Sequence, residues 1–448
     1  MRIIQQILLL LAVFPLVAHA APLEVEYLLK PDHMVGPPLV GVGVQMNPWL
    51  YCAPNWGDVT DANVKDLEQK VRDLGPQHVR IFLELKWWDA NADPKVRESF
   101  VRVCRLAAES GATINATLWR GWGGKNTPQV ATRMADVLQE LLAKDNLQAI
   151  RYITLQNEPN STKITTESYV ELYRVFDTAL RERKIRDHFE IVGGDLLGID
   201  QEPWFNAMAD HLDDVCDGWS VHMYWQYWDT DHIYNRLNSA RLIIDKIAPE
   251  RRRPMHLTEF GVRGIGFPKE RPGHFVDGRP MLYTTTHAME CAMAIIEAMN
   301  MGYVSMLQWD AYDVRYDRSL MTTGVIGEPK DGWPLKPGYD LLRLFTHTTR
   351  PHWRVVEVQG SRSQKRIAAL RGPNGDLTIF ALNCSDQPQT FTIGGLPKGD
   401  WFVQSWNEQG NGKMSKLAPA FVSPNGIAEI KVAPMSMSAL FNHTVDKQ

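Results

Sequence analysis

Hydrophobic and polar residues follow two alternating patterns along the first 350 residues of the chain. Short runs rich in Val, Ile, Leu and Phe are separated by longer stretches in which apolar residues recur every three or four positions, as on one face of a helix. One such face carries Val64, Leu67, Val71 and Leu74, and Gly75 follows where the helix should stop. Starts of the apolar runs are mostly about 30 to 50 residues apart, which is the length of one strand, loop and helix.

Eight of the apolar runs predict strands, at residues 39–45, 78–84, 112–119, 152–158, 189–195, 218–224, 255–260 and 303–310. Runs that are apolar on both faces are typical of parallel strands covered by helices. Eight strand–helix units favour a closed barrel over an open sheet, and the segment after the first strand lacks the glycine spacing of a phosphate-binding loop. The sequence therefore predicts an α/β fold, with a (β/α)8 TIM barrel over residues 21–349.

The pattern changes near residue 350, where short strand-like runs are separated by turn sequences such as PNG, KGD and SPNG. This pattern predicts a C-terminal antiparallel β-sandwich domain over residues 350–448, which a strand from residues 22–30 is expected to complete. The connection to the barrel contains no flexible linker, so the two parts are expected to pack together. The predicted strands of the sandwich are 354–360, 366–372, 376–384, 389–395, 401–407 and 427–433.

The first twenty residues predict a signal peptide that is not part of the fold. Arg2 precedes a short apolar run, and small residues offer a cleavage site after Ala20. The run is too short for a spanning helix, which makes a membrane anchor the less favoured alternative, and we found no other run that is long enough. We therefore expect an exported protein, periplasmic or secreted, with no membrane span after cleavage.

Composition narrows the choice of partners. The formal net charge of −4, which becomes −5 without Arg2, is too small to favour nucleic acid. Five Cys in a chain of this length do not make a disulfide scaffold, although pairing among Cys52, Cys216 and Cys384 stays open. There is no CxxC and no His/Cys cluster at metal spacing, so neither a metal nor a cofactor is expected. We also expect a monomer.

The chain has fifteen tryptophans, and this high count is the first indication that its substrate is a carbohydrate. Aromatic side chains in loops can stack on the flat C–H faces of pyranose rings, whereas aromatics in the core only fill space. Either role fits those that follow predicted strand ends, which are Trp87, Trp88, Trp122, Trp225 and Trp228.

Polar residues at the carboxyl ends of the predicted strands matter most, because catalytic groups of a parallel barrel lie there. Glu158 and Glu259 are three barrel units apart, which places them on opposite sides of a narrow mouth. Two carboxylates that face each other can divide the work, with one donating a proton and the other attacking. The strand-end residues are Arg80, Glu84, Trp119, Arg120, Asn157, Glu158, Asp195, His222, Tyr224, Glu259, Trp309 and Asp310.

Four short motifs carry a family resemblance: LQNEPN (155–160), SVHMY (220–224), LTEFG (257–261) and LQWD (307–310). In this order and spacing the chain resembles the retaining glycoside hydrolases of clan A, which are (β/α)8 enzymes with the acid/base after the fourth barrel strand and the nucleophile at the seventh. The appended sandwich resembles family 39, and NEP with TEFG is common in family 5. The third strand departs from family 5, which often has His there, so the resemblance leaves the exact family open.

The resemblance implies a role for each matching residue. Glu158 would be the acid/base and Glu259 the nucleophile, while Tyr224 would hold an oxygen of that nucleophile. The other implied substrate-binding and supporting residues are Asn157 at the sugar 2-hydroxyl, His222 at Glu158 or the sugar, Arg80 beside the nucleophile, Trp309 as the floor of the −1 subsite, and Trp119 from the third strand.

Two properties of the carboxylates follow from these roles. Arg80 should lower the pKa of Glu259, and aromatic neighbours should raise the pKa of Glu158. The separation should be the short one of retaining enzymes, about 5–5.5 Å, rather than the about 6.5–9.5 Å of inverting enzymes.

The sequence thus predicts an exported retaining glycoside hydrolase for a β-linked poly- or oligosaccharide. A non-catalytic carbohydrate-binding barrel and a transglycosylase that remodels an exopolysaccharide are the alternatives. Bland roles also exist, since Glu158 could cap a helix, His222 could be a hydrogen-bonded core residue and Arg80 a structural ion pair. The long segment 267–281 is expected to wall off one end of the cleft, which favours exo action or short substrates.

Overall fold

The computed structural model describes residues 24–53, 55, 57–120, 122–225, 230–262, 275–276, 279–280, 283–316, 319–407 and 412–445. The predicted signal peptide, Trp228 and most of the segment 267–281 lie outside these residues.

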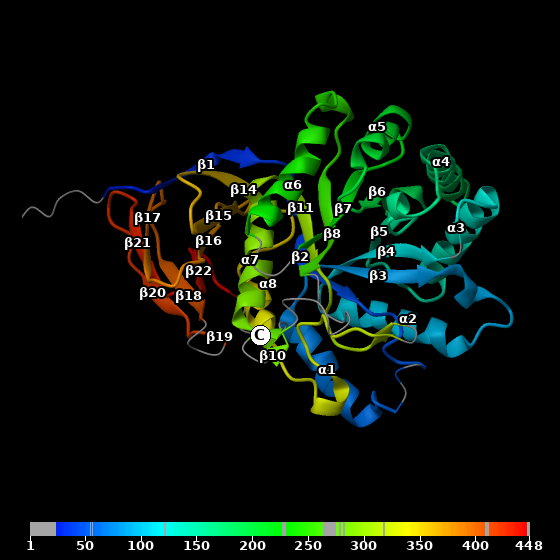
Figure 1. Ribbon diagram of the computed structural model, residues 1–448, viewed down its shortest axis with the longest axis horizontal. Coiled ribbons are helices and arrows are strands. Elements are labelled where there is room, and N and C mark those ends of the chain that lie inside the picture. Colours follow the sequence, from blue (N-terminus) through cyan, green and yellow to red (C-terminus); the bar gives the residue numbers. More distant parts are fainter. Residues whose placement is uncertain are drawn as a thin grey trace, which may run out of the picture.

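Eight parallel strands close into a barrel in the order β11-β2-β3-β4-β5-β6-β7-β8, with helices around it (Figure 1). This is the (β/α)8 fold that the hydrophobic pattern predicts. The barrel strands are β2 (Gly41–Met46), β3 (His78–Glu84), β4 (Thr113–Arg120), β5 (Ile150–Thr154), β6 (Glu190–Leu196), β7 (Gly218–Trp225), β8 (Met255–Val262) and β11 (Tyr303–Gln308). The helices are α1 (Asp61–Leu74), α2 (Pro94–Glu109), α3 (Thr127–Ala143), α4 (Thr166–Glu182), α5 (Gln201–His211), α6 (Thr230–Ile244), α7 (Thr285–Asn300) and α8 (Pro337–Thr348).

Local sequence signals explain where helix α1 begins and ends. Thr60 caps its first turn by accepting a hydrogen bond from the Asn63 N–H, and Gly75 ends it in the left-handed conformation with φ 58°. The four predicted apolar residues of this helix are all buried. Their burial against the barrel confirms the helical face inferred from the spacing.

Two barrel strands end earlier than predicted. β5 stops at Thr154 rather than at residue 158, because the Leu155 N–H donates to the hydroxyl of Tyr173 instead of continuing the sheet. The chain then turns, and Glu158 takes a left-handed backbone conformation with φ 48°. β11 likewise ends at Gln308, so Trp309 lies just beyond the strand. Glu158 and Trp309 therefore lie in turns after their strands, whereas Glu259 lies within β8.

The C-terminal part forms one hydrogen-bonded sheet of ten strands, mostly antiparallel, around a core of its own. β1 joins this sheet by pairing antiparallel with β14 and parallel with β17. The sequence prediction missed the central strand β22, Ser436–Phe441, which has few β-branched residues but is buried throughout. The strands are β1 (Tyr27–Val35), β14 (Arg354–Gln359), β15 (Lys365–Arg371), β16 (Leu377–Asn383), β17 (Gln389–Gly394), β18 (Trp401–Asn407), β19 (Lys413–Met414), β20 (Ala418–Ala420), β21 (Ala428–Val432) and β22.

This sheet packs beside the barrel at α7 and α8 (Figure 1). Arg366 of β15 donates through Nε to Glu297 of α7 at 2.7 Å, and both side chains are more than nine-tenths buried. The indole Nε1–H of Trp406 in β18 donates to the Pro337 carbonyl at the start of α8, at 3.1 Å. Buried polar contacts of this kind tie the two parts together.

Short elements sit in the loops between these strands and helices. Two small hairpins pair β9 (Phe275–Val276) with β10 (Arg279–Pro280) and β12 (Arg315–Tyr316) with β13 (Ser319–Leu320).

All five cysteines are free thiols, so Cys52, Cys216 and Cys384 form no disulfide with one another in this structure. Within the described part of the chain, no helix has the length and apolar character needed to cross a bilayer.

Two histidines are buried inside the barrel, on the strands β3 and β8. Their rings flank Tyr152, with centroid distances of 4.8 Å for His78 and 5.9 Å for His256. Burial lowers the pKa of His78 to about 3 and that of His256 to about 4. Both rings are therefore neutral in the folded protein at pH values where an unfolded chain would protonate them.

We expect the free energy of unfolding to fall as the pH decreases from 6.5 towards 4. The unfolded state takes up protons at His78 and His256 in this range while the folded state does not, and each contributes about 1.4 kcal/mol per pH unit. His256→Asn should give a shallower slope in denaturant unfolding measured between these pH values. His33→Gln is the control, since the His33 side chain is 66% exposed, and equal slopes in both variants would contradict the expectation.

Candidate active site

The polar strand-end residues of the barrel converge on one buried arginine. Arg80 of β3 is fully buried, and its guanidinium group donates hydrogen bonds to five acceptors. The acceptors are Asp195 Oδ2 (2.5 Å), Asn157 Oδ1 (2.6 Å), Gln45 Oε1 (2.7 Å), Glu259 Oε2 (2.9 Å) and Thr117 Oγ1 (3.1 Å). Burial opposes its charge, but Asp195 and Glu259 outweigh burial and raise the pKa of Arg80 above its ordinary value. Arg80 is a permanent cation at the centre of the site.

Glu259 of β8 is held at both carboxylate oxygens. Oε2 accepts the bond from Arg80, and Oε1 accepts a hydrogen bond from the hydroxyl of Tyr224 in β7. Burial and then the charge of Glu259 raise the pKa of Tyr224, so its hydroxyl keeps the proton that it donates. The Glu259 side chain is only 7% exposed. Its position is thereby fixed in the wall of the barrel mouth.

Glu158 lies in the turn after β5, where Pro159 begins a short 3-10 helix (Pro159–Ser161). Its Oε1 accepts a hydrogen bond from Nδ1 of His222 at 3.0 Å, and its side chain is 26% exposed. Asn157, one residue earlier, is fixed by Arg80 through its side-chain oxygen. Glu158 is therefore the more open of the two glutamates.

The expected order of the two carboxyl pKa values is wrong for the protein without substrate. Burial raises the pKa of Glu158, but the hydrogen bond and charge of His222 outweigh it and lower the pKa overall. For Glu259, burial raises the pKa more than His222 and Arg80 lower it. Arg80 lies beside Glu259 and His222 contacts Glu158 as expected, but the depth at which Glu259 is buried and the positive charge of His222 could not be predicted from the sequence.

The two glutamates are close enough to act on one atom. A carboxylate oxygen of Glu158, one of Glu259 and a ring nitrogen of His222 all lie within 4.8 Å of one another. Inverting enzymes need about 6.5–9.5 Å between their carboxyl groups, and retaining enzymes about 5–5.5 Å. Although such spacing would also suit a cation, Arg80 and a protonated His222 already supply positive charge there. The arrangement therefore fits a pair of carboxylates that share one substrate atom.

A cluster of aromatic side chains lies next to Arg80, whose guanidinium carbon is 4.7 Å from the centre of the Phe82 ring. Trp309, which a cis peptide bond joins to Asp310, stacks on Tyr316 with a centroid distance of 5.0 Å and stays partly exposed. Trp119 stacks on Phe82 at 4.8 Å and is also partly exposed. These two rings keep surface that a sugar could contact.

Other tryptophans are in the core and not in the cleft. Trp87, Trp122 and Trp225 are 4%, 5% and 1% exposed, so stacking on a sugar is the wrong role for them in this structure. Trp88 is partly buried against the same core, with Phe100 at 5.9 Å. Loop position alone could not separate these rings from Trp119 and Trp309.

Two further residues belong to the site without having been given a role from the sequence. Gln45 interrupts the apolar run of β2 and accepts from Arg80, and Asp195 ends the GGD stretch of β6. A polar residue inside an otherwise apolar strand is the signal that could have identified Gln45. The sequence identifies Asp195 as a strand-end carboxylate, but it does not show that Asp195 contacts Arg80 and His222.

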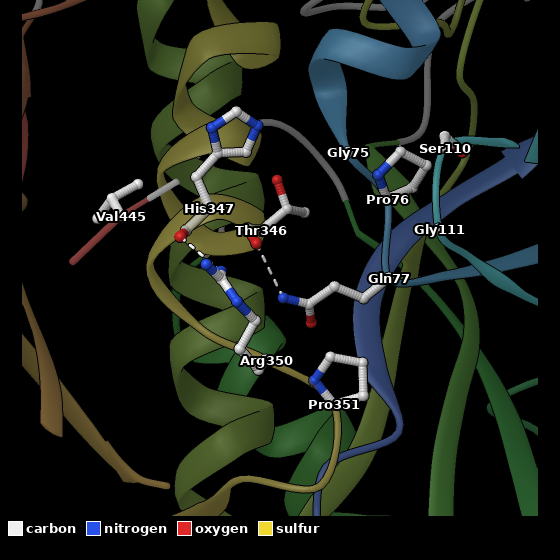
Figure 2. Close-up of a pocket in the computed structure, with 10 residues that line it drawn as sticks. All are labelled: Gly75, Pro76, Gln77, Ser110, Gly111, Thr346, His347, Arg350, Pro351 and Val445. Atoms are coloured by element: carbon white, nitrogen blue, oxygen red, sulfur yellow. Dashed lines mark hydrogen bonds between the residues drawn. The ribbon is translucent and has the colours of Figure 1, made fainter. Parts of the chain in front are cut away.

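The cavity in Figure 2 lies at the other end of the barrel, where β3 and β4 begin. It has a volume of about 180 Å³ and is lined by residues that include Gln77, His347 and Arg350. These side chains are already bonded to backbone carbonyls. Gln77 donates to the Thr346 carbonyl and Arg350 to the His347 carbonyl (Figure 2). The His347 ring also contacts the Asp73 carbonyl. This cavity lies between α8 and the barrel and is separate from the glutamates.

Comparisons with known proteins place the fold. No family model matches the chain, and a search of curated proteins found no match. Among solved structures, a family 30 endoxylanase from Clostridium papyrosolvens C71 is 13% identical, with a TM-score of 0.65, covering 94% of this chain and 100% of that one. Xylanase C from Talaromyces cellulolyticus, a family 30 catalytic domain, is 11% identical with a TM-score of 0.69, covering 93% and 100%.

A family 51 arabinofuranosidase from Xanthomonas axonopodis pv. citri is similar to the same extent: 13% identity, a TM-score of 0.67, and coverage of 94% of this chain and 100% of that one. These neighbours are clan A retaining glycoside hydrolases, with which the resemblance to families 39 and 5 is compatible. At this identity the likeness shows the fold: a closed parallel barrel with an antiparallel-rich sheet domain.

Proposed function

We propose that this chain is an exported glycoside hydrolase that cleaves β-glycosidic bonds of a poly- or oligosaccharide with retention of configuration. The observation that carries the proposal is the approach of Glu158 and Glu259 to within 4.8 Å at the mouth of the barrel. Arg80 and Tyr224 on Glu259, and His222 on Glu158, give the two carboxylates different surroundings. Fold likeness to xylanases and an arabinofuranosidase supports the same reaction class.

The reaction takes two steps. In the first, Glu259 attacks the anomeric carbon while Glu158 donates its proton to the departing glycosidic oxygen, which leaves a glycosyl ester on Glu259. In the second, Glu158 accepts a proton from a water molecule that attacks the same carbon and releases Glu259. Two displacements at one carbon restore the original configuration.

Substrate binding places the proton where the first step needs it. Without substrate, the proton of the pair favours the buried Glu259. A sugar in the cleft covers the exposed quarter of Glu158, and this burial raises its pKa, while its glycosidic oxygen accepts a hydrogen bond from the neutral acid. Glu259, held by donors from Arg80 and Tyr224, is then the carboxylate that ionises.

The neighbouring side chains orient the sugar. Arg80 binds the oxygen of the Asn157 amide, which turns its NH2 group towards the 2-hydroxyl of a sugar at the −1 subsite. Trp309 offers the floor of that subsite and Trp119 a second partly exposed ring. Tyr224 and Arg80 hold the nucleophile against rotation, which keeps its attacking oxygen in line.

The anomeric configuration of the first product tests the proposal. We expect release from at least one substrate in a panel of β-linked oligosaccharides, xylo-oligosaccharides and aryl α-L-arabinofuranosides, and proton NMR in the first minutes should show the substrate's own anomeric configuration in the product. An inverted first product would refute the two-step assignment. No release from any glycan that binds would favour a binding protein, and longer products at high substrate would favour a transglycosylase.

A further inference from the structure

Asp195 is a buried carboxylate that contacts both cations of the site. Its Oδ2 accepts from Arg80 at 2.5 Å, and its Oδ1 lies 3.5 Å from Nε2 of His222, an ion-pair distance without a well-aligned hydrogen bond. All three side chains are fully buried. Arg80 also touches Glu259, and His222 also touches Glu158. Asp195 is thus linked to each glutamate through one cation.

The backbone around Asp195 is shaped to hold it there. The register between β6 and β7 shifts between Gly193 and Leu196, and Gly194 adopts φ 116°. A Cβ atom at Gly194 would lie 2.2 Å from the Ser220 carbonyl oxygen, so only glycine fits. Asp195 itself has φ 53°, an uncommon conformation for a residue with a side chain and one that concentrates at functional sites.

Further hydrogen bonds fix the carboxylate in one orientation. Its Oδ1 accepts from Ser220 at 2.9 Å and from Thr258 at 2.6 Å, and its backbone N–H donates to Ser220 Oγ at 2.7 Å. A carboxylate that accepts several hydrogen bonds is favoured in its ionised form. Burial raises the pKa of Asp195, but Arg80 and His222 outweigh it and lower the pKa well below its usual range.

The charges of this cluster balance only with one proton on the glutamate pair. Arg80 and His222 are cations: burial opposes the charge of His222, but Glu259 and Asp195 raise its pKa to about 10. The carboxyl groups that pair with these two cations are Asp195, Glu158 and Glu259. One proton shared by Glu158 and Glu259 makes the buried cluster neutral, which is the state of lowest cost in a poorly solvated site.

We propose that Asp195 is a positioning residue that anchors Arg80 and His222 against the two glutamates and, by its fixed negative charge, keeps one proton on the glutamate pair. Without this charge, two cations would face one carboxylate and one acid, and the acid would lose its proton more readily. Asp195 touches no part of the substrate in this role. The consequence for rate rests on the proposed function, whereas the consequence for His222 does not.

Other titratable groups near Asp195 do not supply this charge. Tyr169 of α4 accepts a hydrogen bond from the Gly194 N–H through its hydroxyl, and burial raises its pKa, so it is neutral. His256 of β8 is neutral because burial lowers its pKa to about 4. Asp310 lies near Glu259, and burial raises its pKa well above the ordinary value, which favours its neutral form. Asp195 is left as the charged partner of the two cations beside the glutamates.

Asp195→Asn tests the proposal because the amide keeps the shape and removes the charge, and Asn tolerates a positive φ. We expect the pKa of His222, followed by NMR of labelled histidine and assigned with His222→Gln, to fall by about one to three units. In the active enzyme, the alkaline limb of the pH–rate profile should move to lower pH in the same variant. Thr258→Val is the control, since it removes one hydrogen bond from Asp195 and no charge, and should leave the titration of His222 unchanged.

An unchanged His222 titration in folded Asp195→Asn would overturn the proposal, and so would an equal change in Thr258→Val. If Asp195→Asn does not fold, the carboxyl carbon of labelled aspartate in the unaltered protein decides: Asp195 should show no titration between pH 4 and 9. A titration there would overturn the proposal. A parent protein without activity on any glycan would contradict the proposed function alone, because both NMR measurements are independent of turnover.

Discussion

Glu259→Gly is expected to lower turnover by a factor of about 10⁴ or more, since the first displacement loses its nucleophile. Azide should restore part of the activity. The substitution opens space beside Arg80 and His222, whose positive charges attract a small anion to the position of the lost carboxylate. Azide then attacks the anomeric carbon from the nucleophile's side, so the product is a glycosyl azide of inverted configuration, detectable by NMR and mass spectrometry.

Glu259→Gln is the matched control for this experiment. The amide fills the space of the carboxylate. Its single oxygen can still accept from Arg80 while its NH2 group donates to the Tyr224 hydroxyl, so activity should be lost without rescue by azide. Rescue that yields a glycosyl azide of retained configuration would assign the nucleophile to another residue. Equal activity of Glu259→Gly and the parent would remove Glu259 from the mechanism.

The sequence could predict the barrel because the signals of that fold are local. The bounds predicted for strand β3 are the observed ones: Val79, Ile81 and Leu83 alternate along HVRIFLE, and the strand is buried on both faces. The same rule failed for β5, where a side chain from α4 replaces the sheet partner of Leu155. It also missed β22, whose burial depends on pairing with β16 and β18 rather than on its own residues.

The candidate site could be predicted as a set of positions but not as a network. Strand-end placement brought Glu158, Glu259 and Arg80 to one face, as the structure has them. That Arg80 would divide its bonds among Gln45, Asn157 and Asp195 depends on strand register and on the left-handed turns, which no motif encodes. The order of the carboxyl pKa values depends on burial, and burial is a property of the folded chain.

Glu158→Gln should separate protonation of the leaving group from attack. For unactivated saccharides, loss of the general acid is expected to lower kcat/KM by about 10²–10⁴-fold. For an aryl glycoside with a nitrophenol that departs without protonation, the loss in the first step should be much smaller. Comparing kcat/KM for both substrate types in the variant and the parent measures this difference, because kcat/KM reports the first displacement alone.

The amide of Glu158→Gln keeps the hydrogen bond to His222, since its oxygen can accept from the protonated Nδ1, so the change in rate should reflect the missing proton and not a collapsed turn. The alkaline limb of the pH–rate profile should also disappear, because no acid is left to deprotonate. A uniform loss on both substrate types would show that Glu158 positions the sugar rather than protonates it. Since Glu158 and Glu259 are tested by different observables, one for proton transfer and one for attack, the two roles can be assigned independently of each other.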